Sequence, residues 1–422
     1  MKLAFIEAFS GQIENYVFYP LGIASIEAYI NEKLPEIETK VCDTIDAVLE
    51  FCPDVVGVSA TSPHYFKAIE IAEIVKKELG IKVFLGGPHI SSLPESLNSI
   101  FSAGIIGEGE IVFSKIIENL LKKGTIEELT KLKGLVFYDS NERLVNTGKS
   151  EFIKDIDSLP FSNRYWAKLP YFHNMFSSRG CPFKCNFCSS AHIWETCRFY
   201  SPQRVAKELR FIINELDVKF VSFMDDLFAV NLQRVKKIAK AIEFTRDVIF
   251  ACTLRADNCS KKLTDSLFNM GVRYVQLGIE SASPKILPFL KGGKSSPSEN
   301  EKALIDSHES GLHNTGSFII GSPQEDEEDI KMTYNFIKSS LKSGILNEFL
   351  VAPIMAFPGT YFWDYACRKG LIDPFKMDWG KLCIKTDGFD PKYYVFLSEK
   401  LSLKRFAYHL KRFKELHDEF VT

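Results

Sequence analysis

The sequence predicts an α/β protein with a doubly wound, Rossmann-like parallel sheet first, then a partial (β/α)6 TIM-like barrel, and a short helical C-terminal region. Over residues 1–138, short apolar runs alternate with amphipathic helical patterns, which is typical of a doubly wound sheet. Further strand–helix units over residues 171–375 indicate the partial barrel. Residues 139–170 are polar and contain proline, so we expect a linker there, and residues 376–422 are expected to form a C-terminal helical cap.

The composition is that of a soluble globular protein, with 45% hydrophobic and 25% charged residues. A formal net charge of −2 gives no bulk electrostatic reason to bind nucleic acid. The sequence contains no run of about 18 apolar residues, so we expect no transmembrane segment. Its first apolar run is too short and too interrupted for a signal peptide. Ten cysteines in such a chain favour thiols and a metal cluster over a disulfide framework, and we expect a cytoplasmic, reducing location.

In the first domain, apolar runs bounded by turn residues predict strands, and apolar positions three and four residues apart predict helices. Ligands of doubly wound sheets bind beyond the carboxyl ends of the strands, where small residues let the backbone approach a ligand. Two strand ends carry such residues: Ser59, Thr61, Gly86 and Gly87. The predicted strands are 2–6, 40–43, 55–59, 82–89 and 134–138, and the predicted helices are 19–30, 65–79 and 111–124.

The second domain is expected to carry its chemistry at the C-terminal ends of the barrel strands. Charged or small residues fall at four of these ends: Asp225, Arg255, Glu280 and Gly321. Two alternatives stay open, namely that one of Asp225 and Asp226 caps the next helix, and that Arg255 forms an ion pair at the barrel rim. The predicted strands are 172–178, 220–224, 249–254, 274–279, 315–320 and 349–354, separated by helices 202–215, 231–243, 261–270, 299–310 and 326–342.

The C-terminal cap ends in a predicted helix from Ser402 to Glu419 that is basic on one side. We expect this side to be a solvated face, while apolar residues pack the helix onto the domain. The alternative is contact with phosphate or with a membrane surface. The expected packing residues are Leu403, Phe406, Leu410 and Phe413.

Three cysteines, Cys181, Cys185 and Cys188, stand at C-x3-C-x2-C spacing directly after the first barrel strand. Three thiolates on one short loop can hold three irons of a 4Fe–4S cluster and leave the fourth iron open to a small molecule. The alternatives are buried cysteines or part of a zinc site. Zinc motifs usually show two C-x2-C pairs, and the other cysteines of this chain are scattered singly.

With Phe187 before the third cysteine, this loop resembles the cluster-binding loop of the radical S-adenosylmethionine (SAM) enzymes. In that family the open iron chelates the amino and carboxylate groups of SAM, and reduction of the cluster releases a 5′-deoxyadenosyl radical. The order and spacing of the strand-end motifs over about 200 residues support the resemblance. It implies that SAM contacts Phe187, Asp225, Arg255 and Glu280, with space for adenine at Gly321.

The first domain resembles the cobalamin-binding domain of one branch of these enzymes, on the motifs at residues 19–22, 59–61, 86–89 and 107–110. No Asp-x-His-x-x-Gly loop follows the first strand, and no histidine precedes His64, so cobalamin bound here should lack a histidine ligand on cobalt. The alternative is a domain that kept the fold and lost the cofactor. The resemblance implies that cobalamin contacts Ser59, Thr61, Gly86, Gly87, His89 and Glu108, with His64 near its cobalt face.

The resemblance implies a cobalamin-dependent radical SAM methyltransferase that methylates an unactivated carbon. Its cofactors would be a 4Fe–4S cluster, SAM and cobalamin, and its partners a small-molecule or natural-product substrate and an electron donor such as flavodoxin or ferredoxin. Radical cyclisation, ring contraction or oxidation without methyl transfer are alternatives. An alternative from another class is a non-catalytic cobalamin- or SAM-binding regulator, which would not need a reducible cluster.

Overall fold

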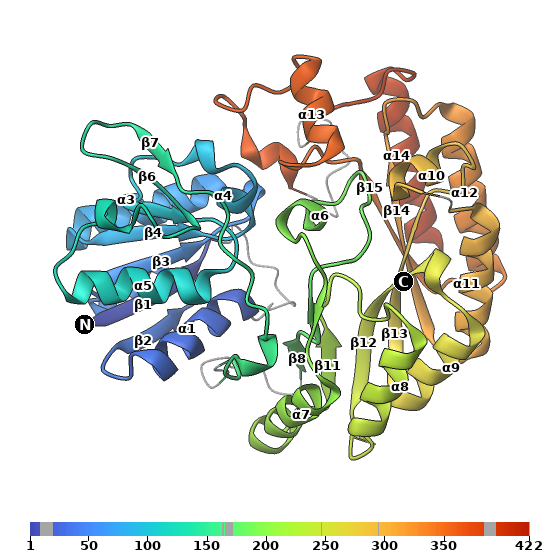
Figure 1. Ribbon diagram of the computed structural model, residues 1–422. Helices are drawn as coiled ribbons and strands as arrows, with labels where there is room; N and C mark the ends of the chain where they lie inside the picture. The colour runs from blue at the N-terminus through green and yellow to red at the C-terminus, as the bar shows by residue number, and fades with distance from the viewer. Residues whose placement is uncertain are drawn as a thin grey trace. The chain divides into compact units, whose positions relative to one another are not determined.

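A computed structural model describes most of the chain as two compact units, which are considered separately below (Figure 1). The described residues are 1–8, 20–162, 164, 172–245, 247–293, 295–383 and 394–421. The first unit comprises Met1–Lys168 and Pro374–Gly380, and the second comprises Leu169–Asp373 and Lys381–Thr422. Tyr19, which begins one of the motifs quoted above, lies outside the described residues.

The first unit is built on a seven-stranded sheet in the order β2-β1-β3-β4-β5-β6-β7. Its first five strands pair in parallel, and β6 and β7 extend the sheet in antiparallel fashion. The order 2-1-3-4-5 is that of flavodoxin-like sheets, whose ligands bind where the strand order reverses, between β1 and β3. The strands are β1 (Lys2–Glu7), β2 (Glu38–Cys42), β3 (Val55–Ser59), β4 (Lys82–Gly86), β5 (Ala103–Ile105), β6 (Leu135–Tyr138) and β7 (Leu144–Asn146).

Helices cover both faces of this sheet, which confirms the predicted doubly wound arrangement. Helices α1 and α5 lie together on one face, and α3 and α4 lie on the other (Figure 1). Phe113 of α5 joins the core at the sheet, with its ring 5.7 Å from Phe5 and 5.6 Å from Phe84. The helices are α1 (Leu21–Lys33), α2 (Ile45–Phe51), α3 (Tyr65–Leu79), α4 (Pro88–Ser92) and α5 (Gly109–Leu121).

Two boundaries of the first unit differ from the prediction. Residues 144–146, which we expected in a linker over 139–170, pair with β6 as strand β7, so the sheet extends beyond residue 138. The segment Pro374–Gly380, most of which we expected in the C-terminal cap, belongs to the first unit. There Trp379 is 3% exposed, and its ring contacts those of Tyr65 and His89. Burial of this large aromatic side chain fixes the segment to the unit.

The second unit contains a six-stranded, all-parallel sheet in the order β15-β14-β13-β12-β11-β8, which confirms the predicted partial barrel. Strands that follow one another along the chain are neighbours in space, as in βα barrels. A two-residue ribbon, β9 (Ser178–Arg179) with β10 (Arg198–Phe199), follows the first strand. The sheet strands are β8 (Phe172–Met175), β11 (Phe220–Phe223), β12 (Ile249–Arg255), β13 (Val272–Glu280), β14 (His313–Ile320) and β15 (Glu348–Pro353).

Helices connect these strands, and most begin at a capping side chain. Asn231 caps α8, and capping boxes start α11 at Ser296 and α12 at Asp326. Neither Asp225 nor Asp226 caps a helix, so that alternative is wrong. The helices are α6 (Ser190–Ile193), α7 (Pro202–Leu216), α8 (Leu232–Ala241), α9 (Lys261–Met270), α10 (Ile286–Lys291), α11 (Pro297–Glu309), α12 (Glu327–Lys342), α13 (Tyr361–Arg368) and α14 (Leu403–Phe420).

The C-terminal helix α14 contacts α12 and packs through an apolar face. Phe406, Leu410 and Phe413 are buried, as expected, whereas Leu403 is 42% exposed because it begins the helix beyond the packed face.

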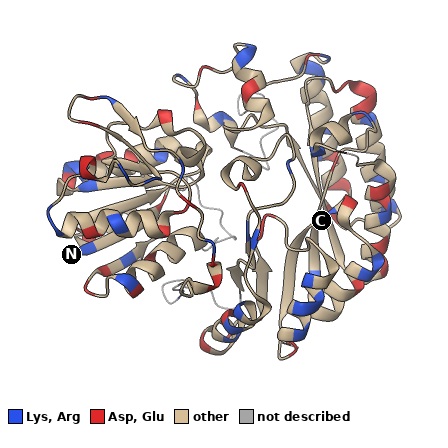
Figure 2. Ribbon diagram, in the orientation of Figure 1, with Lys and Arg blue, Asp and Glu red and all other residues tan. Residues whose placement is uncertain are grey.

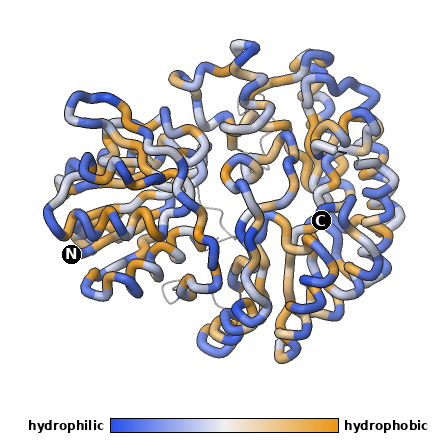
Figure 3. Tube along the Cα trace, in the orientation of Figure 1, coloured by the Kyte–Doolittle hydropathy of each residue, from blue (hydrophilic) through white to orange (hydrophobic). Residues whose placement is uncertain are grey.

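The strands are largely hydrophobic, and the outer helices alternate between hydrophobic and hydrophilic residues (Figure 3). Basic and acidic residues are interspersed along α9, α11 and α12, whereas the charged residues of α8 are all basic (Figure 2). Within the described ranges, no helix has the length and apolar character needed to cross a membrane.

Candidate functional site

The three-cysteine loop leaves the end of β9 through a turn that requires glycine. Gly180 has φ +86°, and a Cβ atom there would lie 2.7 Å from the carbonyl oxygen of Thr196. Within the loop, the N–H of Cys188 donates to the carbonyl of Cys185 over 3.1 Å. Cys181, Cys185 and Cys188 are all free thiols and partly exposed. The fold therefore presents three sulfur ligands on one constrained loop that a cluster can reach.

The loop is anchored on its other side by the segment around α10. The N–H of Asn186 donates to the carbonyl of Leu290 (2.9 Å), and its side-chain amide donates to that of Phe289 (2.6 Å). Gly292 has φ +68°, and a Cβ atom there would lie 2.5 Å from the carbonyl oxygen of Lys184. These contacts fix the middle of the loop, where Cys185 lies. Phe187, the aromatic residue of the motif, is half-buried.

The donor chemistry fits a 4Fe–4S cluster. Within the described residues, no three His, Cys, Asp or Glu side chains are arranged to hold one metal ion. A cuboidal cluster makes a different demand, because each thiolate binds a separate iron. Burial raises the thiol pKa of all three cysteines, that of Cys188 to about 12. Cluster assembly must therefore displace protons from the thiols.

Asp225, at the end of β11, holds the bend that leads into the cysteine loop. Its Oδ1 accepts hydrogen bonds from the N–H of Ser177 (2.8 Å) and from the N–H and hydroxyl of Ser178, and its Oδ2 accepts from the hydroxyl of Ser177 (2.8 Å). Burial raises the pKa of this carboxyl to about 6. Both oxygens are thus used by the protein, whereas we expected Asp225 to meet the SAM amino group. Gly180 and Ser190 donate to the neighbouring Asp226.

Arg255, at the end of β12, connects the barrel rim to the cysteine loop. Its Nε and Nη2 donate to the two carboxylate oxygens of Asp257 over 2.6 and 2.8 Å, so the ion pair that we left as an alternative is present. Its Nη1 also donates to Cys185 Sγ over 2.9 Å. The guanidinium lies 4.2 Å from the centre of the Phe183 ring. Arg255 therefore reaches a candidate cluster ligand directly, which the sequence alone did not reveal.

Glu280, at the end of the neighbouring strand β13, is a buried carboxylate in a strained backbone position. It has φ +66°, which is rare for a residue other than glycine and is often found at functional sites. Its side chain lies over Gly278, where a Cβ atom would come within 2.5 Å of Oε1. Glu280 is 8% exposed, and its carboxylate makes no hydrogen bond or ion pair with a described residue. Burial raises its pKa to about 7 despite the nearby charges of Lys291 and Arg255.

Backbone contacts stabilise this unusual strand end. Lys291 donates to the carbonyl of Gly278 (2.6 Å), and the Asn300 amide donates to the carbonyls of Ile279 (2.9 Å) and Ser281 (3.3 Å). Burial lowers the pKa of Lys291. The carbonyls near Glu280 are thus satisfied by the protein, and the carboxylate is left as the acceptor that a ligand can use.

Gly321, at the end of β14, is held by the acid that follows it. The N–H groups of Gly321 and Ser322 both donate to one oxygen of Glu325, a fully buried residue whose pKa burial raises to about 8. Gly321 has φ +93°, and a Cβ atom would lie 2.8 Å from the Phe406 ring. The structure therefore requires glycine here for packing against Phe406, and the space for adenine that we expected stays a prediction.

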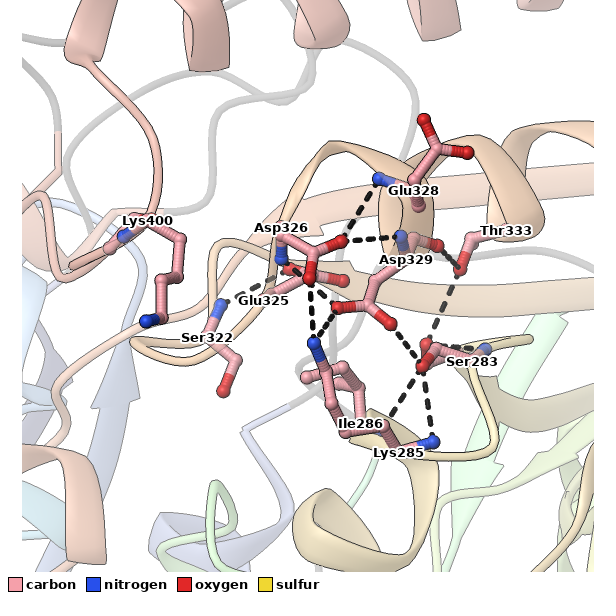
Figure 4. A network of polar contacts seen from close by, with 12 residues as sticks. Ser283, Lys285, Ile286, Ser322, Glu325, Asp326, Glu328, Asp329, Thr333 and Lys400 are labelled. Carbon is pink, nitrogen blue, oxygen red and sulfur yellow. Dashed lines mark hydrogen bonds and ion pairs between the residues drawn. The ribbon is translucent and has the colours of Figure 1, made fainter.

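Beside this turn, α12 is tied to the segment that follows β13. Lys285 reaches the carboxylates of Asp326 (2.9 Å) and Asp329, and the hydroxyl of Ser283 donates to Asp329 over 2.6 Å (Figure 4). These contacts join two strand ends of the barrel and fix the positions of Glu280 and Gly321 relative to each other.

In the first unit, Ser59 and Gly86 face each other at the ends of β3 and β4. Gly86 has room beside it, because a Cβ atom would meet only the carbonyl oxygen of Val58, at 3.9 Å. Gly87 is different: it has φ +96°, and a Cβ atom would lie 2.8 Å from the carbonyl oxygen of Ala60. Ser59 and Gly86 thus form a small, approachable surface that fits a large ligand, and Gly87 is needed for the turn itself.

The polar residues around this edge are largely occupied by protein partners. The Thr61 hydroxyl bonds Nδ1 of His64 over 2.7 Å, and burial lowers the pKa of His64. Glu108 is buried, and its Oε2 accepts from the N–H of Ile153 over 2.7 Å. Thr61 and Glu108 therefore support the loops at the strand ends, and a ligand role for either would compete with these bonds.

His89 lies in the core of the first unit and not at the open sheet edge. It is completely buried, with Nδ1 bonded to the Ser62 hydroxyl (3.0 Å) and Nε2 to that of Ser96 (2.9 Å). The Tyr65 ring stacks on it at 4.0 Å, and Trp379 meets it edge-on at 4.6 Å. Burial lowers its pKa to about 3, so the ring is neutral. None of these four partners could be identified from the sequence pattern.

Comparison with known protein families matches each unit separately. The Radical SAM superfamily profile matches residues 175–337, and the B12 binding domain profile matches residues 15–117. The uncharacterized methyltransferase PH0819 of Pyrococcus horikoshii is 32% identical over 415 residues, which cover 92% of this chain and 86% of that protein.

Two solved structures share the fold. TsrM of Kitasatospora setae, a radical S-adenosylmethionine methyltransferase solved with tryptophan substrate and a SAM analogue, matches with TM-score 0.76 and 13% identity over 98% of this chain and 89% of its own. OxsB, a cobalamin-dependent S-adenosylmethionine radical enzyme solved with aqua-cobalamin, matches with TM-score 0.71 and 19% identity over 87% of this chain and 55% of its own.

Proposed function

Because the chain belongs to the radical SAM enzymes that carry a B12-binding domain, we propose that it is a cobalamin-dependent methyltransferase. It methylates an unactivated carbon of a small-molecule or natural-product substrate. The arrangement that supports this proposal most is the three-cysteine loop together with Arg255 and Glu280, which end the paired strands β12 and β13. The name of the relative PH0819, a methyltransferase, favours methyl transfer.

In this proposal, the cysteine loop holds the cluster and the strand ends hold SAM. Cys181, Cys185 and Cys188 would hold three irons of the cluster, and the fourth iron would be open to SAM. When bound, the cluster and cobalamin supply the electron that cleaves SAM and the methyl group that is transferred. Glu280 accepts hydrogen bonds from SAM hydroxyl or amino groups, since it is buried and has no hydrogen bond to a described residue. Arg255 has donors left beyond its three contacts for a carboxylate.

The first unit supplies a surface for cobalamin at the ends of β3 and β4. Ser59 has a small side chain and Gly86 has none, so a bulky cofactor can approach the backbone there. Thr61 and Glu108 fix the surrounding loops. A cobalt ligand would need to lie on the loop directly after β1, where the sequence has no histidine. In addition, His64 is bonded to Thr61, and His89 is enclosed in the core. We therefore expect cobalamin to bind without a histidine on cobalt.

The test is anaerobic reconstitution with iron, sulfide and cobalamin, followed by analysis of SAM products with flavodoxin or dithionite as reductant. A methyltransferase should form 5′-deoxyadenosine and S-adenosylhomocysteine and should move a deuterated methyl group from SAM into the product. Formation of 5′-deoxyadenosine without methyl transfer would favour cyclisation, ring contraction or oxidation. A protein that binds both cofactors but never cleaves SAM would favour a regulator.

A further inference from the structure

The guanidinium of Arg255 is held in a fixed orientation beside one cluster ligand. Asp257 binds it through two parallel hydrogen bonds, and Asp257 is itself held because Oδ2 accepts from the hydroxyl of Ser295. The Phe183 ring covers one face of the guanidinium at 4.2 Å. The side chains of Arg255 and Asp257 are only 11% and 14% exposed, so water screens this arrangement weakly. The result is a preorganised donor directed at Cys185.

Cys185 differs from the other two cysteines in this respect. Arg255 Nη1 donates to its Sγ over 2.9 Å. Cys181 accepts a hydrogen bond from the backbone N–H of Phe183, and Cys188 accepts one from the backbone N–H of Ser190. Among the described residues, Cys185 is the cysteine of the motif that receives a hydrogen bond from a cationic side chain. The asymmetry gives one corner of the cluster a positive neighbour.

This contact has an electrochemical consequence. Hydrogen bonds to ligand sulfurs and nearby positive charge stabilise the reduced form of an iron–sulfur cluster, because reduction adds negative charge. We propose that Arg255, oriented by Asp257 and Ser295, is a positioning residue that raises the reduction potential of the cluster by donating a hydrogen bond to the Cys185 ligand. The inference rests on the proposed function, since it requires that the loop holds a cluster. It assigns Arg255 a role before SAM binds.

The experiment is a potentiometric titration of the reconstituted holoprotein without SAM, followed by electron paramagnetic resonance (EPR) of the reduced cluster. Arg255→Gln should shift the ratio of reduced to oxidised cluster about tenfold toward the oxidised form at a fixed potential, or about 59 mV for one electron. Arg255→Lys keeps the charge but not the two parallel hydrogen bonds with Asp257. Its reduction potential should fall between those of the wild type and Arg255→Gln. Arg273→Gln is the matched control, because Arg273 lies near the start of β13, away from the cysteine loop. It should titrate like the wild type.

A second measurement removes the dependence on the stability of the Gln variant. Wild-type protein labelled with 15N-arginine should show a weak 15N coupling to the reduced cluster in pulsed EPR, and labelled Arg255→Lys should lack it. An Arg255→Gln protein with a full cluster and the wild-type potential would overturn the inference and leave the proposed function intact. Absence of the 15N coupling in the labelled wild type would also overturn the inference and leave the proposed function intact. A wild-type protein that assembles no cluster would overturn both.

Discussion

The two units differ in how some polar side chains near their strand ends are bonded. In the first unit, His89 bonds two serines and Thr61 bonds His64, so most polar groups are used by the protein. In the second unit, the buried carboxylate of Glu280 has no hydrogen bond to a described residue, and Arg255 points at Cys185. On this contrast we propose that the first unit offers small residues and backbone to a bulky cofactor, and that the second offers charge and sulfur to a reacting one.

The largest effect should come from removing the sulfur ligands of the second unit. Replacing Cys181, Cys185 and Cys188 together with Ala should abolish iron binding and SAM cleavage, because each thiolate holds its own iron. Iron and sulfide assays with visible absorbance measure this. Cobalamin binding should persist, since the first unit has its own sheet and core. Full iron content in the triple variant would show that the loop is not the cluster site.

The second-largest effect should come from removing the carboxylate of Glu280, which has no hydrogen bond to a described residue. Glu280→Ala should weaken SAM binding by about 10- to 150-fold, because loss of a hydrogen bond to a charged group costs on the order of 1.5–3 kcal/mol. Anaerobic calorimetry on protein with a full cluster gives the affinity. Glu327→Ala is the control, since this exposed carboxylate pairs with Arg405 at the start of α12. Equal SAM affinity in wild type and Glu280→Ala would refute the proposed site.

Substitutions of two adjacent glycines, Gly86 and Gly87, should have different effects on the first unit. Gly87→Ala should destabilise it by about 1–3 kcal/mol, because Gly87 has φ +96° and a Cβ atom would press on Ala60. Gly86→Ala meets no such obstacle, so it should keep wild-type stability and still weaken cobalamin binding. Urea unfolding and cobalamin titration separate the two. If Gly86→Ala bound cobalamin as well as wild type does, the cofactor would not approach this edge.

The smallest expected effect is the difference between the two units in how their stability depends on pH. Burial raises the pKa of Glu325 from 4.5 to about 8, so its contribution to stability is full below pH 4.5 and is lost as pH rises toward 8. Burial lowers the pKa of His89 from 6.5 to about 3, so its contribution is full above pH 6.5 and is lost as pH falls toward 3.

Urea unfolding of Glu325→Gln and His89→Gln against wild type, over pH 4 to 8, measures these contributions. The Gln variant of Glu325 should lose less stability than wild type as pH rises. The variant of His89 should lose less than wild type as pH falls. Parallel pH profiles for either variant and the wild type would mean that the residue does not titrate in this way.

The sequence was sufficient to predict the regular elements, because long apolar runs and helical periodicity are local signals. It missed β5 and β7, which are three residues each and get their stability from neighbouring strands. It also missed the short helices, of eight residues or fewer: α2, α4, α6, α10 and α13. It also placed residues 374–380 in the wrong unit, because the packing of Trp379 on His89 joins positions that are far apart in the sequence.

Within the candidate site, spacing identified the cysteine loop, but the partners of its neighbours could not be read from the chain. Asp225 was expected to face SAM, yet it holds Ser177 and Ser178, which lie 48 and 47 residues away and reach it only through the pairing of β8 with β11. Asp257 was visible in the same motif as Arg255. Ser295 was not, because it joins Asp257 from 38 residues away. Such contacts depend on strand register, which no local pattern reports.

The central claim, that one chain carries both a radical SAM cluster and cobalamin, is tested most directly by EPR of the anaerobically reconstituted protein. We expect the signal of one reduced 4Fe–4S cluster and a cob(II)alamin signal without three-line nitrogen splitting, because no histidine lies on the loop directly after β1, and both His64 and His89 bond other side chains. Three-line splitting would contradict the expected cobalt environment. Protein with a full cluster and no bound cobalamin would contradict the claim itself.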